Sequence, residues 1–254
     1  MSALNPTIIT FLFYIVAMIV IGLLAYRATR NFSDYILGGR RLGSFVTALS
    51  AGASDMSGWL LMGLPGAIYL SGLSEIWIAI GLIIGAWLNW LLVAGRLRVH
   101  TEVQHNALTL PDYFSNRFND QRKILRIVSA CVILIFFAIY CASGMVAGAR
   151  LFESMFDLPY STALWISAIA TISYVFIGGF LAVSWTDTIQ AGLMIFALLL
   201  TPIITLLSFS DLSQVTLALE AARPQALNLV SDLSWVAIIS LMAWGLGYFG
   251  QPHI

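Results

Sequence analysis

The chain has 254 residues, of which 60% are hydrophobic and 9% are charged, and its mean hydropathy is +0.91. An average soluble domain carries roughly 25% charged residues, so this composition excludes an ordinary soluble protein and indicates one that crosses a membrane several times. The formal net charge of zero gives no basic surface for a nucleic-acid partner.

Apolar runs of about 20 residues predict transmembrane helices, because that length crosses the hydrocarbon core of a bilayer. The first run has no basic segment in front of it, so we interpret it as a retained helix rather than a signal peptide. We therefore expect an all-α polytopic membrane protein with about seven transmembrane helices. The expected spans are at about 7–26, 44–72, 74–95, 125–149, 161–182, 188–207 and 232 to the end.

Basic residues are concentrated in the connections after the first and third spans, which contain ten of the 12 lysines and arginines. The positive-inside rule places such connections in the cytoplasm. The alternate connections carry acidic residues instead, among them Glu75, Glu153 and Asp211. This alternation predicts a periplasmic N-terminus.

One acidic residue, Asp55, lies inside the second apolar run, in the segment LSAGASDMSGWLLMGLPGAIY. An unpaired charge at the bilayer centre costs from about 3 to more than 10 kcal/mol, so an acid at that depth usually contacts a cavity, an ion or a partner. Neighbours such as Gly52 and Ser57 lower helix propensity. As one helix the run would be about 42 Å long, against a core of roughly 30 Å. We predict a helix break near 53–58.

Such a break would suit both ligands of a cation-coupled transporter. Freed backbone carbonyls and one carboxylate suit a small cation, and the N-terminus of the second half-helix suits an anionic group such as a substrate carboxylate. The alternative is that the small residues only allow tight helix packing and that a distant arginine or serine satisfies Asp55.

A second interrupted segment, MAWGLGYFGQPH, contains three glycines and Pro252 in the seventh span. Paired broken helices in corresponding positions point to a transporter built from two inverted repeats. In this interpretation 1–41 is an extra N-terminal helix with a cytoplasmic loop. The first repeat of five helices is 42–210, and 211–254 is an external loop followed by the start of the second repeat.

Aromatic residues accompany both interrupted segments. Trp244 and Tyr248 are one helical turn apart and could present one face to a ligand, and Trp59 and Tyr140 could do so from the second and fourth spans. Single aromatic residues in spans serve more often in packing or as interfacial anchors. Asp187, at the expected cytoplasmic edge of the sixth span, is interpreted first as a helix cap and second as a gating contact.

Several motifs resemble the sodium:solute symporter family, and within it the proline branch. They are GASDMSGW, YVFIGGFLA over Tyr174–Ala182, GYFGQPHI, YILGGRRLG over Tyr35–Gly43, and TLPDYF. The resemblance implies a LeuT-like core of five-plus-five helices in inverted repeats, of which this sequence contains the first repeat. Because the chain stops within an apolar segment, we expect an N-terminal fragment.

The resemblance also implies site residues. The family's sodium site corresponds to backbone carbonyls of Ala53 and Met56 with Asp55 nearby, completed by hydroxyl groups from a later helix. Arg40 corresponds to a basic residue at the cytoplasmic mouth, where Asp187 is the other gating candidate. Positions implied in proline binding are occupied by Ser57, Gly58, Trp59, Tyr140, Trp244 and Tyr248.

We therefore expect sodium-coupled uptake of L-proline across the bacterial inner membrane. Sodium is the expected coupling ion, and no other cofactor is expected. The expected partners are L-proline, sodium and the lipid bilayer, with no nucleic acid and no obligate protein partner. Two alternatives stay open: the solute-sensing membrane domain of a signalling protein, and a sodium symporter for another small organic solute. An enzyme is not expected, because no nucleophile and base lie at matching depth and His100, His105 and His253 are scattered.

Overall fold

The computed structural model describes residues 6–209, 211–230 and 233–251, and all regular structure in these ranges is helical. This confirms the expected all-α fold class. Pro252 and His253 lie outside the described residues. The chain forms two compact units, one of Met1–Ser54 with Phe118–Leu193 and one of Asp55–Arg117 with Met194–Ile254.

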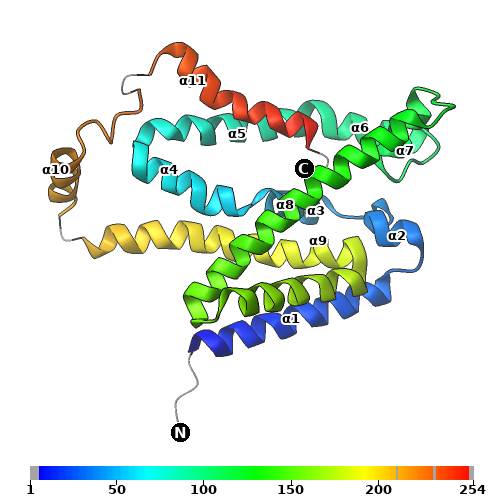
Figure 1. Ribbon diagram of the computed structural model, residues 1–254, viewed down its shortest axis with the longest axis horizontal. Helices are drawn as coiled ribbons and strands as arrows, with labels where there is room; N and C mark the ends of the chain where they lie inside the picture. The colour runs from blue at the N-terminus through cyan, green and yellow to red at the C-terminus, as the bar shows by residue number, and fades with distance from the viewer. Residues whose placement is uncertain (1–5, 210, 231–232, 252–254) are drawn as a thin grey trace, which may run out of the picture. The chain divides into compact units, whose positions relative to one another are not determined.

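The first unit contains long apolar helices and one short polar connection. Its elements are α1 (Pro6–Ala28), α2 (Phe32–Leu37), the 3-10 turn η1 (Gly38–Arg40), α3 (Ser44–Asp55), α8 (Ile124–Phe156) and most of α9 (Tyr160–Ser208) (Figure 1). Its long helices are α1, α8 and most of α9, and the connection between α1 and α3 contains short helical elements.

The helix α9 contains a sharp turn at Gly179, whose φ of 60° and ψ of −153° are rarely adopted by residues with a side chain. A Cβ on this glycine would lie 2.6 Å from Cδ2 of Tyr35. Figure 1 shows α9 reversing direction partway along its length. We expected the connection between these two spans after Ala182; it lies earlier because the glycine pair permits the turn.

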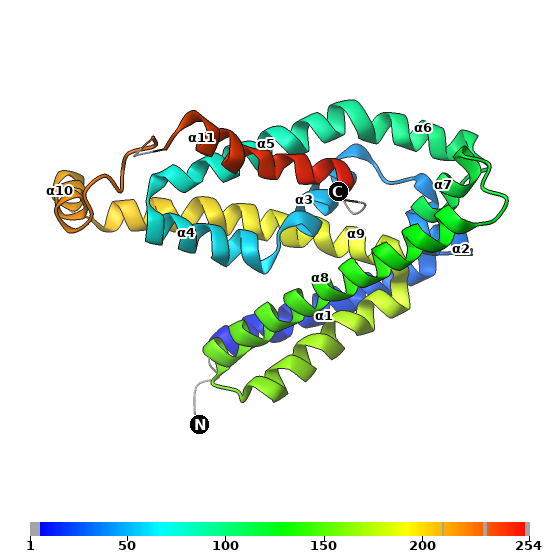
Figure 2. The ribbon, with the colours of Figure 1, turned by 45° about the horizontal axis from the view of Figure 1, so that its top comes forward.

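The second unit contains the remaining elements. They are the π-helix η2 (Trp59–Gly63), α4 (Leu64–Ser71), η3 (Leu73–Glu75), α5 (Ile76–Asn89), the π-helix η4 (Trp90–Ala94), α6 (Gly95–Val103), α7 (Leu110–Arg117), α10 (Leu212–Ala222), α11 (Trp235–Met242) and the 3-10 helix η5 (Ala243–Gly250) (Figure 2).

Two glycines on α5 bring its backbone against the last helices of this unit. A Cβ on Gly81 would lie 2.5 Å from Cα of Met242, and a Cβ on Gly85 would lie 2.6 Å from Cα of Gly245. Small residues at a spacing of four allow membrane helices to approach this closely. The contact fixes where η5 lies along α5.

The segment 223–230 contacts the chain on both sides of the turn between α4 and α5. The guanidinium of Arg223 lies 5.1 Å from the ring centroid of Tyr69 and donates hydrogen bonds to the carbonyl groups of Tyr69 and Leu70. These carbonyls end α4, where helical partners are missing. Trp77 Nε1 adds a 2.8 Å hydrogen bond to the carbonyl of Leu229.

Four helices of the described residues are long and apolar enough to cross a membrane, and two shorter apolar helices accompany them. The chain is therefore a multi-pass membrane protein. The four are Pro6–Ala28, Leu73–Val103, Ile124–Phe156 and Val175–Ser208, and the shorter two are Trp59–Ser71 and Trp235–Gly250.

Candidate functional site

The helix α3 ends at Asp55, and Met56 and Ser57 are not helical. The interruption lies inside the range 53–58, where the sequence predicts a helix break. Ser57 starts the next helical segment, because its hydroxyl accepts a hydrogen bond from the backbone N–H of Leu60 at 3.3 Å. Gly58 follows and precedes the π-helix η2, a type of distortion that is frequent at functional sites.

The carboxylate of Asp55 has a protein partner in the other interrupted segment. The hydroxyl of Tyr248 donates a 2.5 Å hydrogen bond to Oδ2 of Asp55. A hydrogen bond to an ionised carboxylate is short and about twice as strong as one between neutral groups. Tyr248 is only 4% exposed, whereas Asp55 is half-buried. The partner of Asp55 in this contact is a tyrosine, and not the distant arginine or serine of the alternative interpretation.

Trp59 and Trp244 form a second contact between the two interrupted segments. Their ring centroids are 4.8 Å apart and their planes differ by 13°, which is a stacked pair. The indole of Trp59 folds back over Gly63, where a Cβ would lie 2.9 Å from its Cδ1 atom. Gly63 therefore sets the position of Trp59, a role that its place in an apolar run did not reveal.

Tyr140 on α8 contacts the end of α3. Its hydroxyl donates a 2.9 Å hydrogen bond to the backbone carbonyl of Ser54. Ala53 lies in the last turn of α3 and Met56 in the non-helical step, both half-buried. The side chain of Tyr140 therefore donates to a backbone carbonyl at the break, that of the residue immediately before Asp55.

Asp187 lies inside the second part of α9 and does not cap it, so the capping interpretation is wrong. The helix begins again after Gly179 and continues through Asp187 without interruption. Its Oδ2 atom accepts a 2.9 Å hydrogen bond from the hydroxyl of Ser50 on α3, and both residues are buried. Three residues further on, Gln190 Nε2 bonds to the hydroxyl of Tyr14.

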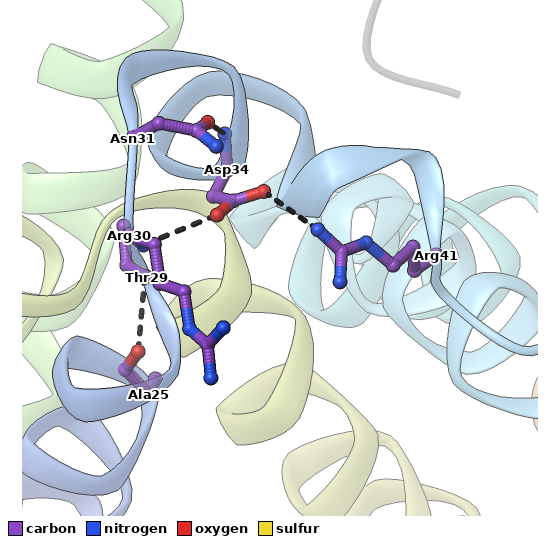
Figure 3. Close-up of polar contacts among 6 residues, drawn as sticks. All are labelled: Ala25, Thr29, Arg30, Asn31, Asp34 and Arg41. Carbon is purple, nitrogen blue, oxygen red and sulfur yellow. Dashed lines mark hydrogen bonds and ion pairs between the residues drawn. The ribbon is translucent and has the colours of Figure 1, made fainter.

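Arg40 lies in the connection between α1 and α3, which is organised by Asp34. The carboxylate of Asp34 accepts hydrogen bonds from the backbone N–H of Arg30 at 3.1 Å and from Arg41 Nη2 at 3.5 Å (Figure 3). Its own backbone N–H donates to Asn31 Oδ1 at 2.8 Å, which begins α2. Asp34 is 6% exposed.

Asp34 is not among the residues predicted from the sequence, although a sequence signal for it exists. Asn31 and Asp34 in NFSD have the spacing of a capping box, which predicts a short helix with an acidic residue in its first turn. The connection then bends through Gly38, Gly39 and Arg40, all of which have positive φ. Arg40 has a φ of 56°, a conformation that costs roughly 1–2 kcal/mol for a residue with a side chain.

The structure thus brings the candidate residues together in pairs: Asp55 with Tyr248, Trp59 with Trp244, and Tyr140 with the carbonyl of Ser54. Asp187 belongs to a different contact, with Ser50. A carboxylate suits a cation, and stacked indoles suit an apolar ring or aliphatic group. The chemistry of these pairs is therefore suited to binding.

Comparison with known proteins gives one family. The sequence model of the sodium:solute symporter family matches residues 35–254. The chain is 66% identical over all 254 residues to the sodium/proline symporter of Escherichia coli (strain K12). It is also 66% identical to the sodium/proline symporter of Haemophilus influenzae, and 53% identical over 237 residues to the high-affinity proline transporter PutP of Bacillus subtilis (strain 168).

The chain spans about half the length of these curated relatives: 51% of the Escherichia coli and Haemophilus influenzae proteins and 50% of the Bacillus subtilis protein. It is itself covered completely in the first two comparisons and to 93% in the third. No solved structure gives a significant match to the chain.

Proposed function

The chain belongs to the sodium:solute symporter family, and from this premise we propose that it serves sodium-coupled uptake of L-proline across the bacterial inner membrane. The relatives that are 66% identical carry the name sodium/proline symporter. They are transporters rather than enzymes, which supports a protein that moves its substrate without changing it.

The observation that carries the proposal is the acid at the helix break. Asp55 ends α3 immediately before two non-helical residues, and in the part of the chain that the structure describes its carboxylate accepts a hydrogen bond from a tyrosine hydroxyl and forms no ion pair with a cationic side chain. A carboxylate that is not neutralised by arginine or lysine keeps its attraction for a cation. Interrupted helices within the membrane are the usual source of carbonyl ligands for sodium.

In the proposed mechanism, Asp55 and the carbonyl groups of Ala53 and Met56 bind sodium. Four aromatic residues act on the substrate: the indoles of Trp59 and Trp244 cover the apolar ring of proline, and the hydroxyls of Tyr140 and Tyr248 act as polar contacts. Backbone N–H groups after the break, from Ser57 and Gly58 onward, attract the proline carboxylate. Sodium and proline then bind to the same pair of interrupted segments.

The orientation in the membrane is also part of the proposal. The arginine-rich connection that contains Arg40 faces the cytoplasm by the positive-inside rule, so the N-terminus is periplasmic. Arg40, held in a left-handed conformation by the folded connection, is the proposed contact at the cytoplasmic mouth. Asp187, bonded to Ser50 on the helix that ends at the break, is the proposed gating contact on α9.

Uptake tests the proposal. The complete gene is expressed in bacteria that lack their own proline carriers, and uptake of labelled L-proline is measured with sodium, with lithium, and with potassium as the only added cation. We expect uptake that needs sodium and is blocked by excess unlabelled proline. Uptake that is equal in potassium refutes sodium coupling. Sodium-dependent binding without accumulation supports a solute sensor, and competition only by a different solute refutes proline.

A further inference from the structure

The carboxylate of Asp55, the proposed cation ligand, already accepts a hydrogen bond from Tyr248, a proposed substrate contact. Tyr248 lies on η5, and its hydroxyl donates a 2.5 Å hydrogen bond to Oδ2 of Asp55. The two residues are 193 positions apart in sequence, so the bond connects the two interrupted segments directly. The hydrogen bond therefore joins the proposed sodium ligand to the helix that also carries Trp244, another proposed substrate contact.

The position of Tyr248 is strongly constrained. It is 4% exposed, and η5 is fixed against α5 by the close approach at Gly81 and Gly85. A hydroxyl held in this position keeps its hydrogen bond to Asp55 until another positively charged or polarised group binds the carboxylate. A bound cation is such a group, because it neutralises the charge that the O–H dipole is attracted to.

We propose that sodium and the Tyr248 hydroxyl compete for Asp55, and that this competition is the coupling element between sodium and substrate. The inference deepens the proposed function and depends on it. When sodium binds, the carboxylate releases the hydroxyl, which becomes available to hydrogen-bond the substrate. When the substrate binds first, it takes the hydroxyl and leaves Asp55 free for sodium.

The sign of the coupling follows from this arrangement. Each ligand removes the internal hydrogen bond that opposes the other, so each raises the affinity for the other by the same factor. A hydrogen bond to a charged group contributes enough to change a binding constant about tenfold or more. Sodium should therefore bind about tenfold more tightly when proline is present.

Tyr248→Phe tests the competition, since it removes the hydroxyl and keeps the ring. In the variant the hydroxyl no longer competes with sodium for Asp55, so sodium should bind about tenfold more tightly than in the wild type when proline is absent. Proline should bind more weakly because a polar contact is lost, and added proline should no longer improve sodium affinity. A tyrosine that only contacts substrate would weaken proline binding and leave sodium affinity in the absence of proline unchanged.

The measurement uses the protein produced from its complete gene and purified in lipid nanodiscs. Binding of radioactive sodium is titrated with and without L-proline. Tyr26→Phe is the matched control, because Tyr26 is 60% exposed on α1, away from both interrupted segments in sequence; it should behave as the wild type in both titrations. Thermal unfolding of each variant shows whether it is folded.

The outcomes separate the inference from the proposed function. Tighter sodium binding by Tyr248→Phe without proline, together with loss of the proline effect, supports the competition. A wild type that couples sodium to proline, with a folded Tyr248→Phe variant whose sodium affinity without proline is unchanged or weaker, overturns the competition alone. A folded wild type that binds neither ligand overturns the proposed function and the inference with it. If Tyr248→Phe does not fold, Tyr248→Leu, which has no hydrogen-bond donor and adds no volume at this buried position, is measured against the same two results.

Discussion

Replacing Gly85 by alanine should displace η5 from α5 and disturb both contacts between the interrupted segments. A Cβ at this position would lie 2.6 Å from Cα of Gly245, whereas ordinary van der Waals contact begins at 3.4 Å. The neighbouring atom is backbone, so no flexible side chain can move aside. The two helices must separate locally by about 1 Å to admit one methyl group.

The expected magnitude follows from the cost of overpacking. Forcing an extra carbon into a close-packed contact costs about 1–3 kcal/mol, which is a factor of roughly 5–150 if the site must be assembled for a ligand to bind. A displacement of that size moves Trp244, the residue before Gly245, off its 4.8 Å stack with Trp59. We therefore expect lower thermal stability and weaker proline binding together.

Gly95→Ala is the matched control, because Gly95 lies on the same continuous helix and a Cβ there meets nothing within 4 Å. Both variants gain the higher helix propensity of alanine, so only the contact at Gly85 differs between them. Unfolding is followed in detergent by tryptophan fluorescence, and proline binding by equilibrium titration. A Gly85→Ala protein that matches Gly95→Ala in both measurements would refute the close approach of α5 and η5.

Three further substitutions follow from single contacts. Gly63→Ala places a Cβ against the ring of Trp59, and we expect about tenfold weaker proline binding, measured by titration, with unchanged sodium binding. Asp34→Ala leaves the backbone N–H of Arg30 unpaired, which should cost about 1–3 kcal/mol in thermal unfolding; Asp34→Asn keeps an acceptor and should lose less, and equal losses would contradict this role. Arg223→Ala removes the donor that ends α4, and limited proteolysis should cut the segment 223–230 faster than in the wild type.

Much of the fold was predictable because membrane helices depend on local composition. Runs of apolar residues placed α1, α8 and the helix that begins at Leu73, since each must satisfy its own backbone inside the bilayer. The sequence pattern predicts the boundary between the two spans of α9 after Ala182, later in the chain than the turn at Gly179. That turn depends on a positive φ at Gly179, and the apolar run continues on both sides of that glycine without a polar residue to mark the turn.

The site was predictable in its residue types and less so in its pairs. Asp55 was recognisable as a charge within an apolar run, and the glycines marked both interrupted segments. The bond from Tyr248 to Asp55 depends on how α5 and η5 pack, and no local pattern specifies which hydroxyl reaches which carboxylate. Asp187 was misinterpreted as a cap because a turn was expected just before it.

The most direct test of the account is the sodium dependence of proline uptake in Asp55→Asn, compared with the wild type at equal protein abundance in the membrane. The substitution keeps the size of the side chain and removes the charge, so the packing of α3 should persist while the attraction for the cation is lost. We predict that half-maximal uptake requires at least about tenfold more sodium, with abundance nearly unchanged. An Asp55→Asn protein with the sodium dependence of the wild type would contradict the assignment of Asp55 as the cation ligand.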